Sequence, residues 1–228
     1  MAQGKKYQNA ARSYDLERMH SVEEASTIIG AFPKRNYEET VDMVLRLGVD
    51  PRKADEMIRG TVSLPAGTGK AVRVAVFAQG DQAQAARDAG AEFVGAEDLA
   101  EQVEGGMLDF DVTIAAPDMM PIVGKLGRVL GPRSLMPNPK TGTVTPDVAK
   151  AVEEFKGGKV EFRTDKFANV HVPVGKVSFS DDDIAKNIES VLDELRRLKP
   201  ASAKGQYIKK ASISSTMGPS VKLDVSGM

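Results

Sequence analysis

Hydrophobic and polar residues change their spacing along the chain, and each change predicts a different kind of element. From residue 39 to 49 apolar side chains occupy every second position, which predicts a strand with one buried face. Ahead of it, Ser21 followed three residues later by Glu24 resembles a capping box and predicts the start of a helix. The first part of the chain therefore predicts a helix and a half-buried strand, followed by a short strand at 61–64.

The middle of the chain contains short apolar runs separated by segments with helical spacing. Val72 to Ala78 and Val112 to Ala116 are almost continuously apolar, which is typical of strands buried on both faces. A short strand at 92–94 and helices at 81–89 and 97–103 are predicted between them. This alternation of strand and helix predicts a parallel sheet covered by helices.

An irregular stretch follows Pro117, and regular structure resumes at Thr145-Pro146-Asp147. Thr145 is the predicted N-cap of a helix that runs to Lys156, with a proline in its first position. The last third returns to half-buried strands, with a long amphipathic helix that begins at Ser180. The predicted strands of this part are 160–163, 169–174, 176–179, 207–215 and 221–225.

The middle block differs in kind from the two ends. We therefore expect an α+β and α/β fold of two domains: a split, sandwich-like α+β domain and an inserted, Rossmann-like three-layer α/β domain. Residues 1–68 plus 159–228 form the first, and residues 69–158 the second. Glycines flank both crossings, which predicts a double hinge. The hinge glycines are Gly67, Gly69, Gly157 and Gly158.

Composition narrows the class of protein. The chain has 228 residues, of which 41% are hydrophobic and 28% charged, and it contains no cysteine. Disulfides and thiolate metal sites are thus excluded. No apolar run approaches the roughly 20 residues of a membrane helix, and the N-terminus lacks a secretory signal. We expect a cytoplasmic globular protein that does not enter the membrane.

Net charge is −1, but the charges are unevenly placed. Seven basic residues and no acidic ones lie between Glu194 and Asp224, and a second acid-free stretch runs from Asp118 to Asp147. Residues 70–158 carry 9 basic and 13 acidic side chains, and the rest carries 22 and 19. Local basic patches can bind a polyanion on a neutral protein, because screening limits charge effects to about 8–10 Å. The alternative is two solvated surfaces with locally biased charge.

Motifs for catalysis or cofactors are absent or incomplete. Pro65 to Lys70 lacks the spacing of a phosphate-binding loop, and Ala71 stands where that loop needs a hydroxyl. Gly80 is alone where a dinucleotide fingerprint needs three glycines. His20 and His171, the only histidines, have neither metal-ligand spacing nor a partner nucleophile. The sequence therefore predicts no cofactor, no metal and no enzymatic activity.

Two loops are unusual. Residues 131–140 contain three prolines and two cations but no acid, which indicates either a functional loop or a rigid surface connection. The turn at 214–220 combines small hydroxyl residues with Gly218, which allows a ligand backbone to come close. Without other information, that turn is an ordinary hairpin connection.

Several long strings resemble one family of proteins. They include Leu47 to Lys53, Arg59 to Val62, Leu126 to Arg133, Leu135 to Lys140 and Thr216 to Ser220. In this order they resemble the L-one family, the bacterial large-subunit ribosomal proteins of the mobile side stalk, over nearly the whole chain. Two positions depart from the family pattern: Ser134 stands where glycine is usual, and Tyr37 where phenylalanine is expected.

The resemblance implies a function and a set of residues. Members bind a stem-loop region of large-subunit rRNA, contact exit-site tRNA and repress translation of their own mRNA. It also implies a structural protein that is monomeric when free. By matching position, the RNA surface includes Tyr37, Thr40, Arg163, Asp165, Lys166, His171, Lys176, Ser178, Thr216, Met217 and Gly218. Arg128, Arg133 and Lys140 in the middle block are expected as secondary RNA contacts.

Two other classes of function compete with this interpretation. A metabolic enzyme would use the α/β domain and the crevice between domains, but it would need a cofactor motif or a catalytic constellation. A protein-interaction module would leave the acid-free basic stretches without a role. Absorbance at 260 and 280 nm of protein purified in low salt separates these classes, because co-purified RNA favours the ribosomal interpretation.

Overall fold

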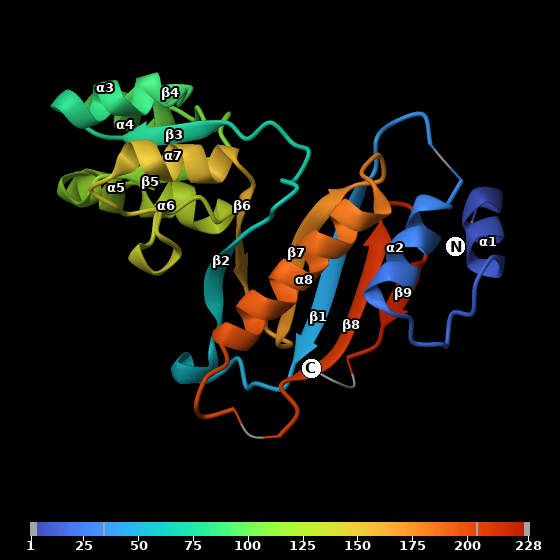
Figure 1. Cartoon of the computed structure of the whole chain (residues 1–228). Coiled ribbons are helices and arrows are strands. Elements are labelled where there is room, and N and C mark those ends of the chain that lie inside the picture. The colour runs from blue at the N-terminus through green and yellow to red at the C-terminus, as the bar shows by residue number, and fades with distance from the viewer. Residues whose placement is uncertain (1–3, 34, 204, 226–228) are drawn as a thin grey trace. The chain divides into compact units, whose positions relative to one another are not determined.

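The structure is a computed structural model that describes residues 4–33, 35–203 and 205–225. The chain divides into two compact units (Figure 1). The terminal unit combines both chain ends, Met1–Gly69 and Val160–Met228, and the middle unit is Lys70–Lys159. Each unit has its own cluster of buried hydrophobic side chains.

The terminal unit contains a four-stranded antiparallel sheet in the order β7-β1-β8-β9 and a two-stranded sheet of β2 and β6. Strand β1 pairs with β7 on one side and β8 on the other, and both come from the second half of the chain. The elements are α1 (Lys5–Arg12), α2 (Val22–Gly30), β1 (Thr40–Leu47), the 3-10 turn η1 (Ala54–Glu56), β2 (Arg59–Ser63), β6 (Lys159–Arg163), β7 (Asn169–Lys176), α8 (Asp181–Arg197), β8 (Ile208–Ser215) and β9 (Ser220–Leu223).

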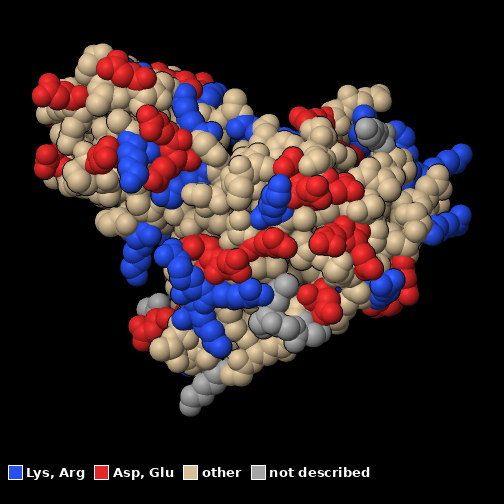
Figure 2. Space-filling model, in the orientation of Figure 1, with Lys and Arg blue, Asp and Glu red and all other residues tan. Residues whose placement is uncertain are grey.

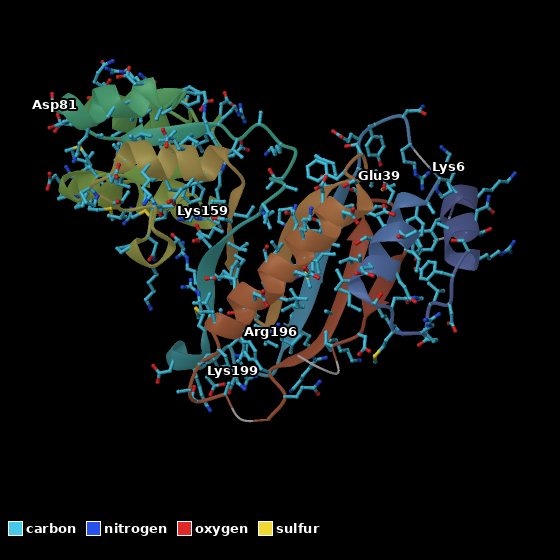
Figure 3. The ribbon with its side chains drawn as sticks, viewed as in Figure 1. Lys6, Glu39, Asp81, Lys159, Arg196 and Lys199 are labelled. Atoms are coloured by element: carbon cyan, nitrogen blue, oxygen red, sulfur yellow. The ribbon has the colours of Figure 1, made fainter. Side chains whose placement is uncertain are left out.

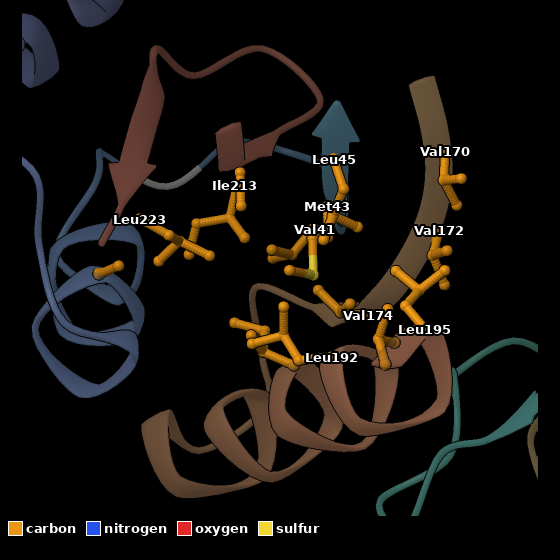
Figure 4. Close-up of a cluster of buried hydrophobic side chains, with 14 of the residues drawn as sticks. Val41, Met43, Leu45, Val170, Val172, Val174, Leu192, Leu195, Ile213 and Leu223 are labelled. Atoms are coloured by element: carbon orange, nitrogen blue, oxygen red, sulfur yellow. The ribbon is translucent and has the colours of Figure 1, made fainter. Parts of the chain in front are cut away.

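The core of the terminal unit lies between one face of this sheet and the helices α2 and α8 (Figure 4). Alternate residues of the strands point into it, and Met43, Leu45 and Val170 are fully buried. From α8, Ile184 and Leu195 meet them. Complete burial of such side chains stabilises the fold by about 1.5–3 kcal/mol each. The alternation predicted for residues 39–49 is therefore confirmed.

The helix starts follow the predicted capping chemistry. The Ser21 side chain accepts a hydrogen bond from Glu24 N at 3.1 Å, and the Ser180 side chain accepts one from Asp183 N at 3.2 Å. Three acidic residues occupy the first turn of α8, and Arg196 and Arg197 lie in its last turn. Both arrangements suit the helix dipole.

The middle unit is built on a parallel sheet in the order β4-β3-β5. Its central strand β3 is buried at all four positions, as expected for a strand covered on both faces. The elements are β3 (Val74–Phe77), α3 (Gly80–Asp88), β4 (Phe93–Gly95), α4 (Glu97–Glu104), β5 (Val112–Ala115), η2 (Pro117–Met119), α5 (Met120–Lys125), α6 (Gly127–Leu130), η3 (Gly131–Arg133), η4 (Pro139–Thr141) and α7 (Val148–Lys156).

Three local predictions are wrong. The N-cap of α7 is Asp147, whose side chain accepts from Lys150 N at 3.2 Å, and not Thr145. No separate strand forms at 176–179, because β7 continues to Lys176 and the chain then turns at a Phe179 N–Lys176 O hydrogen bond. The stretch after Pro117 is helical in large part rather than irregular.

Within the described residues, no helix combines the length and apolar character that crossing a membrane requires.

Candidate nucleic-acid interface

The four-stranded sheet has one covered and one open face. Because α2 and α8 both pack against the inward residues of the strands, the outward residues have no helix over them in the described part of the chain. The outward positions are half-buried or exposed. They form rows across the sheet, with His171, Val44, Ser212 and Lys222 in one row and Asn169, Arg46 and Lys210 in the next.

The two sides of the terminal unit differ in charge. Helix α8, which lies over the covered face, carries six acidic and three basic residues. In Figure 2 acidic and basic side chains are interspersed on that side, with a group of cations toward the end of α8 where Figure 3 labels Arg196 and Lys199. The strands of the open face carry Arg46, Lys210 and Lys222 against Asp42, although Lys222 is paired with Glu17 at 2.6 Å. The open face is therefore the better surface for a polyanion.

One group of the predicted residues meets at the end of the sheet where β1 begins. Thr40 N donates to Thr216 Oγ1 at 3.2 Å, and Thr216 N donates to Thr40 O at 3.0 Å. Lys176 Nζ donates to Thr40 Oγ1 at 3.0 Å, and Ser178 Oγ donates to the Glu38 carboxylate. Residues more than 130 positions apart in sequence thus form one polar cluster.

A buried carboxylate holds the turn between β8 and β9 in place. Glu39, labelled in Figure 3, is 7% exposed. Its Oε2 accepts a hydrogen bond from Met217 N at 3.0 Å. Its Oε1 lies 3.4 Å from Arg35 Nε, and Arg35 Nη2 donates to Met217 O at 3.5 Å. Glu39 therefore binds the backbone N–H of Met217, and Arg35 binds its carbonyl. The sequence pattern did not predict this role, because nothing near residue 39 indicates a backbone partner 178 positions away.

Gly218 permits the close packing of this turn. A Cβ atom there would lie 2.4 Å from Ser215 Oγ and 3.0 Å from the Phe32 ring, so a larger residue would displace the turn. A pocket of about 310 Å³ opens beside it, lined by Tyr7 of α1, by Tyr37 and by Met217, among others. The side chains of Tyr37 and Met217 are 54% and 53% exposed. Exposed apolar groups beside hydroxyls and cations are suited to unstacked bases.

A second group of the predicted residues lies toward the other end of the sheet. Arg163 ends β6, and both Arg163 and Lys166 are exposed and form no ion pair among the described residues. His171 stands on the open face of β7, with its Nε2 3.7 Å from Asp165 Oδ2. Partial desolvation raises the pKa of Asp165, but hydrogen bonds, chiefly from Asn169, outweigh it and lower the pKa below its usual value. The Asp165 carboxylate thus organises the turn before β7.

Asp42, on the open face, has a raised pKa that makes the stability of the protein depend on pH. Desolvation raises the pKa of Asp42 above its ordinary value, although His171 and Lys176 act in the opposite direction. Since the folded pKa exceeds the unfolded one, ionisation of Asp42 lowers stability once the pH rises above about 3.9. We expect Asp42→Asn to increase the free energy of unfolding at pH 7, with the gain shrinking as the pH falls toward 4. Urea unfolding at both pH values measures this, with Glu189→Gln as the control. An equal gain at both pH values would contradict the expectation.

The cations predicted as secondary contacts lie in the middle unit. Arg128 in α6, Arg133 and Lys140 are all exposed. None of the three forms an ion pair in the part of the chain that the structure describes. Between Arg133 and Lys140 the loop is held by Asn138, whose carbonyl accepts from the hydroxyls of Thr141 and Thr143.

The four predicted hinge glycines have different local roles. Gly67, Gly69 and Gly158 have φ values of 71°, 69° and 105°, which favour glycine. Gly157 instead ends α7 with φ −73°. Gly67 O accepts a hydrogen bond from Asn187 Nδ2 at 3.0 Å, so this part of the first crossing is attached to α8.

The described residues contain no group of three or more His, Asp or Glu side chains that could hold a metal ion. The arrangement offers cations, hydroxyls, backbone amides and exposed aromatic faces. These groups can bind RNA, and they show no nucleophile paired with a base.

Comparison with known proteins gives a consistent result. The model of the ribosomal protein L1p/L10e family matches residues 29–219. Large ribosomal subunit protein uL1 of Cutibacterium acnes is 58% identical over 224 residues, which cover 98% of this chain and 97% of that protein. The uL1 protein of a Nocardioides species is also 58% identical, over 98% and 93% of the two chains. That of Corynebacterium glutamicum strain R is 56% identical, over 96% and 93%.

Proposed function

The chain belongs to the ribosomal protein L1p/L10e family, and from this premise we propose that it binds large-subunit rRNA through the open face of the terminal sheet. It is a structural protein of the large ribosomal subunit and not an enzyme. The observation that carries the proposal is the helix-free sheet face, bounded at both ends by residues predicted to contact RNA.

The proposed roles follow from the chemistry of each group. Arg163, Lys166 and Lys176 neutralise phosphates and orient the RNA. Thr216 and the backbone of the 216–218 turn bond sugar hydroxyls and base edges in an irregular RNA element. Tyr37 stacks on an unpaired base, a contact worth about 1–3 kcal/mol.

The distance between the two groups of predicted contacts favours a structured RNA over a short single strand. Strand β7 has eight residues, which at a rise of about 3.3 Å extend for roughly 23 Å between the two groups of contacts. An RNA that reaches both ends presents two separate backbone segments at a set distance. Shape therefore contributes to selection as much as sequence does.

A binding titration tests the function. We expect the full chain to bind a fragment of large-subunit rRNA containing the side-stalk region far more tightly than a small-subunit rRNA fragment of equal length or heparin. The logarithm of affinity should fall with the logarithm of salt by about 0.7–0.9 per neutralised phosphate, and a few contacts give a shallow slope. Equal affinity for all three polyanions would refute the proposal.

We also propose that the terminal and middle units are separate domains joined by the glycine crossings. The terminal one is the split α+β domain, and the middle one is a Rossmann-like three-layer insertion. Removing residues 70–158 and joining the ends should then leave most of the affinity for rRNA, because the contacts belong to the terminal domain. Binding is measured by gel shift, after circular dichroism has established that the shortened protein is folded. Loss of binding by the folded deletion protein would contradict the assignment.

The remaining roles extend the same proposal. In the side stalk, the cations of the middle unit (Arg128, Arg133 and Lys140) would approach exit-site tRNA or the rRNA backbone. The same sheet face would bind a similar site in the protein's own mRNA and so repress translation. Because one surface serves both RNAs, we expect the rRNA fragment to displace that mRNA segment. Simultaneous binding of both to the monomeric free protein would contradict a shared surface.

A further inference from the structure

Phe167 is the most exposed large hydrophobic side chain in the described part of the chain. Its exposed fraction is 76%, against 57% for Met19 and 54% for Tyr37. Single apolar side chains are common on protein surfaces, so exposure alone does not indicate a ligand. The turn that holds Phe167 provides the second observation.

This turn is fixed by the Asp165 side chain. Asp165 Oδ1 accepts hydrogen bonds from Phe167 N at 2.8 Å and from Asn169 N at 2.7 Å, and its Oδ2 accepts from Asn169 Nδ2 at 3.0 Å. A side-chain oxygen that binds the backbone two residues on forms an Asx turn. Phe167 therefore projects from a turn held by three hydrogen bonds to one carboxylate.

The next residue anchors the turn to the sheet. Ala168 is 4% exposed, and its carbonyl accepts a hydrogen bond from Leu47 N at 2.9 Å. Its φ is 63°, a backbone conformation that residues with a Cβ rarely adopt. Ala168 is thus buried in an unfavourable conformation while Phe167, beside it, stays in solvent.

The neighbours of Phe167 indicate which ligand fits it. Lys166 is adjacent and exposed, and His171 on the open face lies 3.7 Å from the same Asp165 carboxylate. An aromatic ring beside a free cation suits a nucleotide, because the ring stacks on the base and the cation meets the phosphate.

We infer that Phe167 is a stacking platform for one unpaired base of the bound RNA, at the opposite end of the sheet from Tyr37. The inference rests on the proposed rRNA binding, and it adds a contact that the matched family positions do not include. It gives the surface an aromatic contact at each end.

The chain contains no tryptophan, so one introduced residue can report on this contact alone. We expect the fluorescence of Phe167→Trp to be strongly quenched when the side-stalk rRNA fragment binds, because a stacked base contacts the indole ring. The matched control is Met19→Trp, another exposed position, one residue before the His20 bridge to β9 at the other edge of the sheet. Binding itself is followed independently by anisotropy of labelled RNA.

Affinity measurements complete the test. Phe167→Ala and Phe167→Leu should each weaken rRNA binding about ten-fold, with the salt dependence unchanged because no phosphate contact is lost. Leucine keeps an apolar side chain, so a loss with both variants identifies the aromatic face as the contact. RNA binding with no fluorescence change in Phe167→Trp, or an equal change in Met19→Trp, would overturn the inference and leave the proposed function standing. Absence of RNA binding by the unmodified chain would instead refute the proposed function.

Discussion

Replacing Thr216 with valine should lower the affinity for the side-stalk rRNA fragment more than ten-fold and leave the fold intact. The substitution keeps the size and branching of the side chain but removes its hydroxyl. That hydroxyl accepts from Thr40 N and donates to Thr40 O, both at 3.2 Å, and it is exposed beside the predicted contacts. Its loss removes a group proposed to bond the RNA and loosens the turn that presents Met217. Ten-fold corresponds to about 1.4 kcal/mol, within the range of one or two hydrogen bonds.

The control is a hydroxyl on the other side of the sheet that also donates to a backbone carbonyl. Ser190 lies on α8, and its Oγ donates to Lys186 O at 2.9 Å. Ser190→Ala should leave RNA binding unchanged. Both proteins are compared by filter binding at a fixed salt concentration, together with their thermal unfolding. Undiminished binding by a folded Thr216→Val protein would remove this turn from the interface.

Asn187→Ala should lower the free energy of unfolding by about 3 kcal/mol. Asn187 is fully buried in α8, and its amide holds three backbone groups: Oδ1 accepts from Ala66 N at 3.1 Å, and Nδ2 donates to Gly67 O at 3.0 Å and to Val174 O at 2.8 Å. A buried polar group left without its partner costs about 1–3 kcal/mol, and water can reach the two partly exposed groups. The effect therefore lies below the sum of three full penalties.

Urea unfolding at pH 7 measures this loss, and Glu189→Ala, an exposed change two residues further along α8, is the control. We expect the control to stay within about 0.5 kcal/mol of the unmodified protein. If Asn187→Ala were as stable as the unmodified protein, the hydrogen bonds to the 65–69 crossing would contribute nothing to the stability of the terminal unit. The same crossing would then be free of α8, contrary to the hydrogen bonds described above.

Much of the fold could be predicted because burial imposes regular spacing. Strand β1 alternates cleanly, and the buried strand β3 is apolar throughout. Helices α5 and α6 were not predicted, because Pro121, Gly124 and Gly127 are poor helix formers. Their buried side chains nevertheless recur with helical spacing, at Val123, Leu126 and Leu130, and this signal was available.

The sequence predicted the contact residues of the candidate site but not the residues that hold them in position. The matched motifs named Thr40, Lys176 and Thr216, which the structure brings together. Arg35 and Glu39 were not named, because their contacts with Met217 depend on strand pairing across the whole chain. Local patterns report burial and turns, whereas a hydrogen bond between distant segments exists only once the sheet has formed.

The segment before α2 pairs with the last strand of the terminal sheet. His20 N donates to Lys222 O at 2.9 Å, and Asp224 N donates to His20 O at 2.8 Å, so this segment occupies the outer edge of β9. A bare strand edge is a template on which another chain can add a strand. The segment around His20 therefore covers this edge, and we expect proteolytic trimming past His20 to expose it and to make the protein more prone to aggregate.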